Sequence, residues 1–218
     1  MSKGLGKKLM WLMAIMLLVG FMTCGAAYSE EKVIKIGTLF PLTGPMALAG
    51  QRCKAAVEAA VDLINNSYPN IPVPLAAQKG LLGGYKIVLV NADHQGKPDV
   101  GKSEAERLYD QEGVFAVIGC YNSAVTKPAS LVAERRKKIF MCGCSSSAEL
   151  TKRGTRYFFR IAPTDETESI EFVNFIKWLN ATKGTNYKTF GVIYENTEFG
   201  KHAAQEAKKA IEAAGFQY

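Results

Sequence analysis

The sequence contains neither of the two glycine motifs that most often bind nucleotide phosphates, G-x-G-x-x-G and G-x-x-x-x-G-K-[ST]. Its densest glycine group, Gly80, Gly83 and Gly84, comes before an apolar run that is typical of a strand. A phosphate loop lies instead between a strand and the helix that follows it, where backbone N–H groups face the phosphate. The glycines therefore indicate no nucleotide site, and we expect no cofactor.

The chain is also poor in histidine, with only His94 and His202. Catalysis by a cysteine needs a histidine and an orienting group beside the thiol, and no pattern in the sequence brings these together. Cys142 and Cys144 are spaced more closely than the pairs of zinc sites, and no second pair accompanies them. The sequence therefore predicts neither a metal site nor an enzyme. A cysteine-dependent enzyme is the alternative, which loss of turnover after thiol alkylation would support.

A concentrated charge of one sign is absent as well. The formal net charge is +7, but Lys3, Lys7 and Lys8 lie within residues 1–27, a segment without acidic residues. Without that segment, 24 basic residues stand against 20 acidic ones, and the net charge falls to +4. So small and dispersed a charge argues against a nucleic-acid partner.

Long apolar runs are limited to one, residues 9–22, and no later run is long enough to span a bilayer. A basic start, a short apolar run and small residues after it are typical of a secretory signal peptide. We predict a signal peptide over residues 1–27, cleaved after Ala27, and a mature protein located in the periplasm. A lipid anchor on Cys24 is the alternative.

Four cysteines follow the predicted signal peptide: Cys53, Cys120, Cys142 and Cys144. In an oxidising compartment a disulfide is expected to be stable, but four cysteines allow three complete pairings. The sequence does not choose among these pairings. The alternative is that the thiols are buried at strand ends and act as small apolar side chains.

Strands and helices are predicted to alternate along residues 33–161. Five runs are typical of strands, at 34–40, 85–93, 115–120, 138–143 and 156–163. Three segments with helical periodicity separate them, at 47–65, about 98–112 and about 124–136. Strands joined by helices pair in parallel through right-handed crossovers, so we expect an α/β fold with a doubly wound parallel sheet. This segment is the predicted N-terminal lobe.

Residues 162–218 are predicted to begin a C-terminal lobe. One helix starts at Asp165, with Glu168 completing a capping box, and a second helix covers 199–214. The run 189–195 between them is typical of a strand. We interpret an aromatic cluster on the first helix as core or as packing between the units: Phe172, Phe175 and Trp178. These elements are too few for an independent sheet, so we expect a chain truncated within this lobe.

Two of the predicted strands end in loops that carry serine. The first loop contains Tyr121, Asn122 and Ser123, and the second contains Cys144, Ser145 and Ser146. In open parallel sheets, ligands bind at the carboxyl ends of the strands, beside the N–H groups of helix N-termini. Hydroxyls at that place suit a carboxylate or another small polar anion. Each loop alone is explained equally well by serines that cap their own helices, but two such loops favour a binding site.

Phe199 lies at the corner between the run 189–195 and the last helix. At that corner it would face the same cleft as the two serine loops. The alternative is that Phe199 is a hydrophobic staple for its own helix.

Five segments, taken in order, resemble type I periplasmic solute-binding proteins of ABC importers: IKIGTLFPLTGPMALAGQ, DHQGKPDV, IGCYNSAVTKPAS, CSSSAELTKRGTRYFFRIAPTDE and VIYENTEFGKHAAQEAKKAIEAAG. The resemblance is to the branch that binds branched-chain and other amino acids, and it covers residues 33–218. It implies two doubly wound lobes joined by a hinge, with the solute held between them. It also implies a chain close to twice this length and a membrane ABC permease as partner.

The resemblance further implies roles for single residues. In amino-acid-binding members, the loop that matches Tyr121, Asn122 and Ser123 holds the ligand carboxylate, with the residue at Ser123 as a donor. The loop that matches Ser145 and Ser146 contributes a carbonyl and a hydroxyl to the ligand amino group. Phe199 stands where an aromatic residue of the second lobe packs on the ligand.

The sequence departs from that family pattern in three places. Leu48 and Ala49 stand where amino-acid binders often have an aromatic lid, which leaves the side-chain specificity open. The acidic residue that fixes the ligand ammonium would lie beyond Tyr218. The cysteine pair of some members has no match at Gly96 and Asn122. We predict an exported protein that captures an amino acid or a related carboxylate; a ligand-binding sensor of the same fold is the alternative.

Overall fold

The computed structural model of the chain describes residues 32–74 and 76–218. The predicted signal peptide, its cleavage after Ala27 and the alternative lipid anchor on Cys24 lie outside the described residues. Within the described part, no helix is both long and apolar enough to cross a membrane.

Five parallel strands form one sheet, in the order β2-β1-β3-β4-β5. The strands are β1 (Val33–Phe40), β2 (Lys86–Asp93), β3 (Ala116–Gly119), β4 (Ile139–Cys142) and β5 (Phe158–Arg160). All five were predicted from the apolar runs, although β5 is much shorter than the predicted run 156–163. The order places β1, the first strand of the chain, near the middle, which is the doubly wound arrangement that the alternation predicted.

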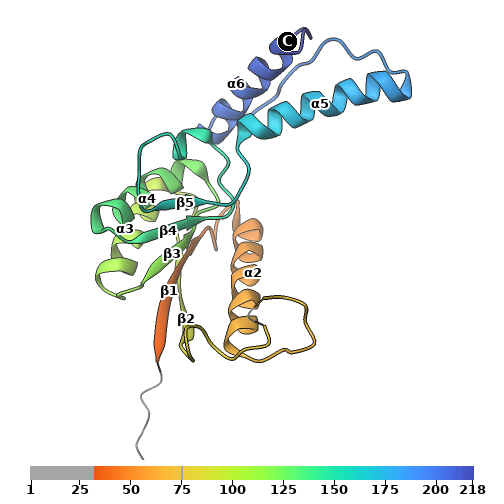
Figure 1. Cartoon of the computed structure of the whole chain (residues 1–218). Coiled ribbons are helices and arrows are strands. Elements are labelled where there is room, and N and C mark those ends of the chain that lie inside the picture. Colours follow the sequence, from red (N-terminus) through yellow and green to blue (C-terminus); the bar gives the residue numbers. More distant parts are fainter. Residues whose placement is uncertain (1–31, 75) are drawn as a thin grey trace, which may run out of the picture. The chain divides into compact units, whose positions relative to one another are not determined.

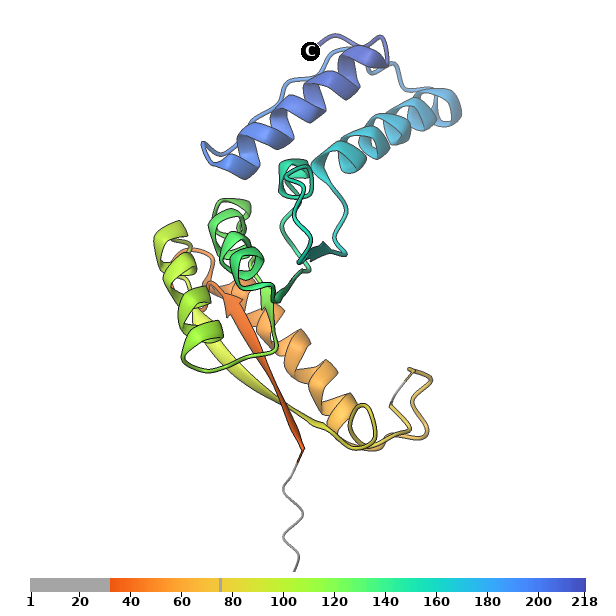
Figure 2. The ribbon, with the colours of Figure 1, turned by 60° about the vertical axis from the view of Figure 1, so that its left-hand side comes forward.

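Helices cover both faces of this sheet, as Figures 1 and 2 show: α2 (Ala47–Asn65) lies on one face, and α3 (Pro98–Asp110) with α4 (Ser123–Arg136) lies on the other. Pro98 opens α3 at a position where no N–H is needed. A glycine is required at Gly101, because a Cβ there would collide with the Val125 side chain of α4. The two helices can therefore pack closely on each other.

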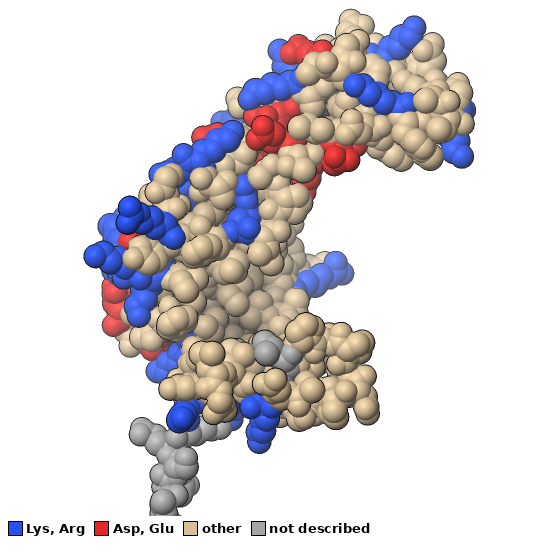
Figure 3. All heavy atoms as spheres, viewed as in Figure 1, with Lys and Arg blue, Asp and Glu red and all other residues tan. Residues whose placement is uncertain are grey.

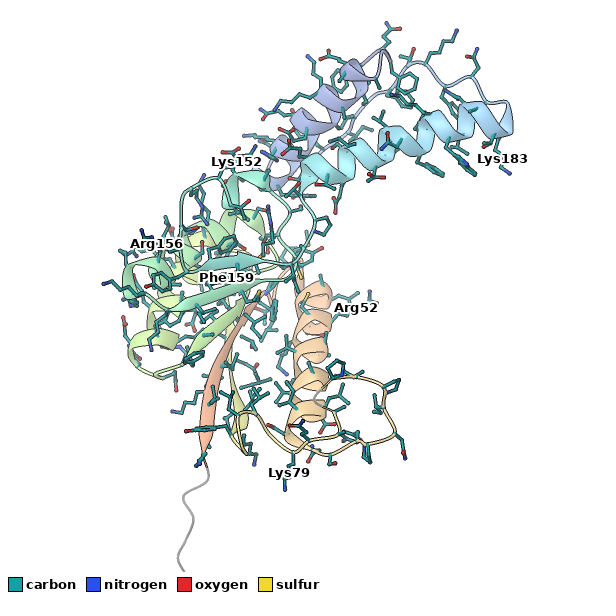
Figure 4. All side chains as sticks on the ribbon, in the orientation of Figure 1. Arg52, Lys79, Lys152, Arg156, Phe159 and Lys183 are labelled. Carbon is teal, nitrogen blue, oxygen red and sulfur yellow. The ribbon has the colours of Figure 1, made fainter. Side chains whose placement is uncertain are left out.

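The core lies between the sheet and the α3–α4 layer. Its fully buried members include Leu39, Leu108, Val117, Val132 and Phe140. The α2 layer is less buried, since Gly50 is the only buried residue of α2. Figure 4 shows Arg52 pointing from α2 away from the sheet. The α2 range agrees with the prediction, and Ala56 and Ala60 of this helix are exposed.

Residues 162–218 form two helices that pack on each other, α5 (Asp165–Lys183) and α6 (Glu198–Ala213). The predicted capping box at Asp165 is wrong by one residue. Thr164 is the N-cap of α5, and its Oγ1 accepts a hydrogen bond from the Thr167 N–H at 3.1 Å. Thr197 caps α6 in the same way, through the Gly200 N–H at 3.2 Å.

The predicted strand at 189–195 is wrong. Its only ladder contact is an isolated parallel bridge between Thr189 and Gln217, with the Phe190 N–H donating to Gln217 O and the Gln217 N–H donating to Lys188 O, both at 2.8 Å. No other strand of the described chain lies beside this segment. A strand needs neighbours for its backbone groups, and an apolar run without them stays irregular.

The interpretation of the α5 aromatic cluster as core is also wrong. Phe172, Phe175 and Trp178 are 48%, 53% and 49% exposed. Phe175 stacks on Trp178 with ring centroids 5.9 Å apart, and Phe172 meets Phe190 edge to face at 6.2 Å. The buried face of α5 is carried by Val173 and Ile176 instead.

Candidate functional site

The two serine loops meet at the carboxyl ends of β3 and β4, which are adjacent and parallel. The Ser145 Oγ lies 3.2 Å from Cys120 O, 3.1 Å from Tyr121 O and 2.7 Å from Thr126 Oγ1. The Ser147 N–H donates to Ser123 Oγ at 3.4 Å. These bonds join the loop after β3 directly to the loop after β4, so the two walls predicted from sequence do adjoin.

A cavity of about 560 Å³ opens at this end of the sheet. Five of the six predicted site residues line it: Tyr121, Asn122, Ser123, Ser146 and Phe199. Ser145 does not line the cavity, since it is 1% exposed and its hydroxyl bonds to the neighbouring loop. A role for Ser145 in contacting ligand stays a prediction; in this structure it supports the wall.

Helix capping does not account for the first loop. Asn122 is the N-cap residue of α4, but its side chain makes no capping bond and its Oδ1 is buried without a partner. Ser123 is already helical, and its hydroxyl accepts from the second loop rather than from its own helix. Capping of α4 therefore does not explain why these polar residues stand in the loop.

The start of α4 presents backbone donors to the cavity. The N–H groups of Val125 and Thr126 donate to Asn122 O at 3.1 and 2.9 Å. Those of Ser123 and Ala124 find no acceptor within residues 32–74 and 76–218, and both residues line the cavity. Unpaired N–H groups at a helix N-terminus carry a partial positive charge and attract anions. This wall therefore suits a carboxylate.

The opposite wall is acidic. Glu168 of α5, together with Glu195 and Glu198 at the start of α6, lines the same cavity. Figure 3 shows acidic side chains gathered where α5 and α6 begin. Glu198 is engaged by Lys127 of α4, with Nζ and Oε1 3.0 Å apart. Carboxylates at this place suit the ammonium group of a zwitterion.

Phe199 contributes an apolar surface to this wall and is 40% exposed. It is the second residue of α6, after the N-cap Thr197. A hydrophobic staple would instead occupy the position before the N-cap, so the staple interpretation of Phe199 is wrong.

Nine residues of the lining were not among the predicted site residues, although one of them, Cys144, belongs to the second serine loop: Met46, Gly96, Pro98, Ala124, Cys144, Glu168, Glu195, Thr197 and Glu198. A usable signal existed for Glu195 and Thr197, because Glu195 ends the run 189–195 and Thr197 comes two residues later, as Tyr121 and Ser123 come after β3. The remaining seven depend on how the loops fold over the sheet edge.

Asp93, at the end of β2, stabilises two loops at the edge of the cavity, here called the rim. Its carboxylate accepts from the Leu42 N–H at 2.8 Å, the Gln95 N–H at 2.8 Å and the Thr43 hydroxyl at 2.5 Å. Burial alone would raise the pKa of Asp93, but these hydrogen bonds outweigh it and hold the pKa below its usual value. The bonds tie the loop before Met46 to the loop that carries Gly96.

His94 lies beneath the same rim and is fully buried. Its Nδ1 accepts the Gly96 N–H at 3.0 Å, which fixes the turn at the cavity edge. Burial lowers the pKa of His94 to about 4, although the nearby Asp93 opposes the change. The imidazole is therefore neutral at pH 7 and acts as a hydrogen-bond acceptor.

These features allow binding of a small molecule with an anionic end and a cationic end. In the described part of the chain, no three His, Cys, Asp or Glu side chains converge in a way that holds a metal ion.

Comparisons with known proteins identify the family of the chain. The family model described as "Periplasmic binding protein" matches residues 33–218. A curated relative, Leu/Ile/Val-binding protein homolog 3 of Brucella melitensis, is 29% identical over 95% of this chain and 50% of its own length. The chain thus spans about half the length of the curated relatives that it matches.

Solved structures share the fold. An ABC transporter substrate-binding protein of Desulfitobacterium hafniense, in complex with Leu, matches 85% of this chain and 49% of its own with a TM-score of 0.67 and 24% identity. A solute-binding protein of Rhodopseudomonas palustris, in complex with 3,4-dihydroxybenzoic acid, matches 85% and 45% with a TM-score of 0.70 and 19% identity. These neighbours are substrate-binding proteins and not enzymes. With the family model matching all of residues 33–218, the chain belongs to the periplasmic binding protein family.

Proposed function

We propose that the protein captures a small solute with a carboxylate, an amino acid or a related acid, outside the cytoplasm and delivers it to a membrane ABC permease. The observation that carries this proposal is the pair of opposed walls in one cavity. The N–H groups of Ser123 and Ala124 have no acceptor on one side, and three glutamates line the other. The predicted signal peptide over residues 1–27 and the family support the extracytoplasmic location.

The carboxylate of the solute would bind at the N-terminus of α4. There it accepts from the backbone N–H groups and from the Ser123 hydroxyl, with the partial positive charge of the helix end favouring its negative charge. An ammonium group would face Glu195 and Glu168, and an apolar part would pack on Phe199. Ser146 and Tyr121 complete the wall on the side of the sheet.

Two structural neighbours support a proposal that specifies the carboxylate of the solute and does not specify its side chain. One holds Leu and the other holds 3,4-dihydroxybenzoic acid, so their ligands share the carboxylate and little else. In this protein the N-terminus of α4 would bind the carboxylate of the solute. The residues on the opposite wall would select the rest of the molecule.

Capture would proceed by hinge closure. We assign residues 33–161 to one lobe and 162–218 to the other, with the connection after β5 as the hinge. The Asp165 N–H already donates to Ser146 O at 3.0 Å across this junction. A solute that contacts both walls binds the closed arrangement better than the open one, which shifts the population toward closure.

The test is titration calorimetry of the purified chain with L-leucine, L-isoleucine and 4-hydroxybenzoate. Binding of at least one of them supports the proposal, and Ser123→Ala should weaken it by about 1–3 kcal/mol, because a charged acceptor loses its donor. Ser130→Ala is the matched control, since Ser130 is equally buried in the same helix but bonds to Lys127 O and Arg153.

Two results would contradict the proposal. The first is a folded chain that binds none of these acids and no other amino acid. The second is equal affinity in the wild type and Ser123→Ala, which would remove the α4 terminus from the site even if a solute binds.

A further inference from the structure

Two cysteines far apart in the chain lie in contact beside the cavity. The Cys53 and Cys144 sulfurs are 3.5 Å apart, although the residues are 91 positions apart in sequence. Cys53 belongs to the first half of α2, and Cys144 lies in the loop after β4, here named the serine loop (residues 143–147). Both side chains are partly exposed, and Cys144 lines the cavity. Reagents in solution can therefore reach this pair.

The other two cysteines of the described chain behave differently. Cys120 and Cys142 are both 0% exposed within the core. Burial raises the pKa of the Cys120 thiol well above its usual range, with Cys142 nearby adding to the effect. Burial keeps reagents away from both thiols, so these two serve as small apolar side chains. That was one of the alternatives left open by the sequence.

We propose that Cys53 and Cys144 form a reversible disulfide that ties α2 to the serine loop of the cavity. A disulfide needs the sulfurs to approach to about 2.05 Å, a closure of roughly 1.5 Å that rotation of two side chains at the surface can supply. Only one of the three complete pairings of four cysteines contains this bond. The other two cysteines of that pairing, Cys120 and Cys142, stay reduced.

The bond forms by thiol–disulfide exchange with an oxidant that itself carries a disulfide. The Cys53 thiolate attacks one sulfur of the oxidant, forms a mixed disulfide and releases the first thiolate. The Cys144 thiol then loses its proton and attacks the Cys53 sulfur, which releases the second thiolate. Two protein thiols are oxidised by two electrons, one external disulfide is reduced to two thiols, and the two protons end on these thiols.

The order of attack follows from the surroundings of Cys144. Burial, together with the contact to Cys53, raises the pKa of Cys144 to about 12. Cys144 therefore stays protonated at pH 7 and is slow to open the exchange.

The bond would act on the cavity and on stability together. Met46, just before α2, and Cys144 both line the cavity, so the bond fixes two parts of its wall relative to each other. It also closes a long loop of the unfolded chain. We expect the oxidised protein to melt about 5–10 °C above the reduced one, as for other disulfides that close long loops.

The experiment is disulfide mapping of the full chain after incubation with oxidised glutathione, followed by alkylation of free thiols and trypsin digestion without reductant. Trypsin releases Cys53 with Lys54 as a dipeptide, and Cys142 with Cys144 in peptide 139–152. The expected product is peptide 139–152 joined to the dipeptide and carrying one alkylated thiol. This product should disappear on treatment with dithiothreitol.

Serine variants separate the two thiols of that peptide. Cys142→Ser should keep both the linked product and the difference in melting temperature, whereas Cys144→Ser and Cys53→Ser should lose both. Fragmentation of the wild-type product gives the same assignment if a variant fails to fold. Linkage through Cys142 or Cys120, or complete alkylation of Cys53 and Cys144 after oxidation, would overturn the proposal. None of these readouts depends on which solute the cavity binds.

Discussion

Residues 33–161 and residues 162–218 contain apolar runs of the same kind, but only the first region turns them into a sheet. The run at 115–120 becomes β3, which is paired on both sides by β1 and β4. The run at 189–195 finds one bridge, between Thr189 and Gln217. Local β propensity is similar in the two runs, so the difference lies in whether neighbouring strands are present.

The same contrast holds for individual side chains. Phe140 of β4 is 0% exposed and packs near Phe158, with ring centroids 6.1 Å apart. Phe175 of α5 is 53% exposed. The first region therefore owes its stability to a large buried core, and the second owes it to two capped helices with a small apolar cluster that includes Val173, Ile176 and Ile211.

Truncating a phenylalanine in each region gives the largest test of this comparison. Phe140→Ala should lower the free energy of unfolding by about 3–5 kcal/mol, because it removes buried area and leaves a cavity. The matched control Phe175→Ala should cost below about 1 kcal/mol, since little burial is lost. Urea unfolding followed by circular dichroism measures both. Equal losses would show that the two regions share one core.

Acid should destabilise the first region through His94. In the folded state its pKa is about 4, against the usual 6.5. Between these values the unfolded chain binds a proton that the folded chain does not, so stability falls as pH decreases from 6.5 to 4. The loss reaches roughly 3 kcal/mol below pH 4. His94→Gln should lose this part of the pH dependence when urea unfolding is compared at pH 7 and pH 4.5; a slope as steep as in the wild type would contradict it.

The contact between α5 and α6, within residues 162–218, should respond to His202. Its Nδ1 lies 3.0 Å from Oδ2 of Asp165, and both residues are buried. His202→Leu leaves that carboxyl oxygen without a partner, so opening of the α5–α6 pair should become easier by about 1–3 kcal/mol. Hydrogen exchange should then speed up in residues 162–218 and stay unchanged in β1 and β3. Exposed Gln205→Ala in the same helix is the control, and faster exchange throughout the sheet would count against two separable regions.

Much of the fold was predictable because it depends on local pattern. The α2 range, the end of α4 at Arg136 and the five strands follow from apolar periodicity and from breaks in it. The strand predicted at 189–195 failed because pairing is not local. The exposure of Phe172, Phe175 and Trp178 was missed for the same reason, since one helical stripe does not say what covers it.

The site divides in the same way. Tyr121, Asn122, Ser123 and Ser146 were found by a rule about strand ends, and the sheet places them together. Glu168 was missed, because the position of α5 over the cavity depends on the chain direction after β5. The proximity of Cys53 to Cys144 likewise appears only when α2 and the serine loop are both in place.

The stacking of Trp178 has an optical consequence. Trp178 is the only tryptophan among the described residues, it is half exposed, and the Lys183 ammonium lies 5.7 Å from its ring centre (Figure 4 labels Lys183 at the end of α5). Its emission wavelength depends on how far solvent reaches the indole on α5. The strands of the sheet contain no tryptophan, so their unfolding does not change this emission directly. A fluorescence melt therefore follows the helical pair, and circular dichroism follows the whole chain. Two midpoints that differ would show, without any substitution, that the regions unfold separately.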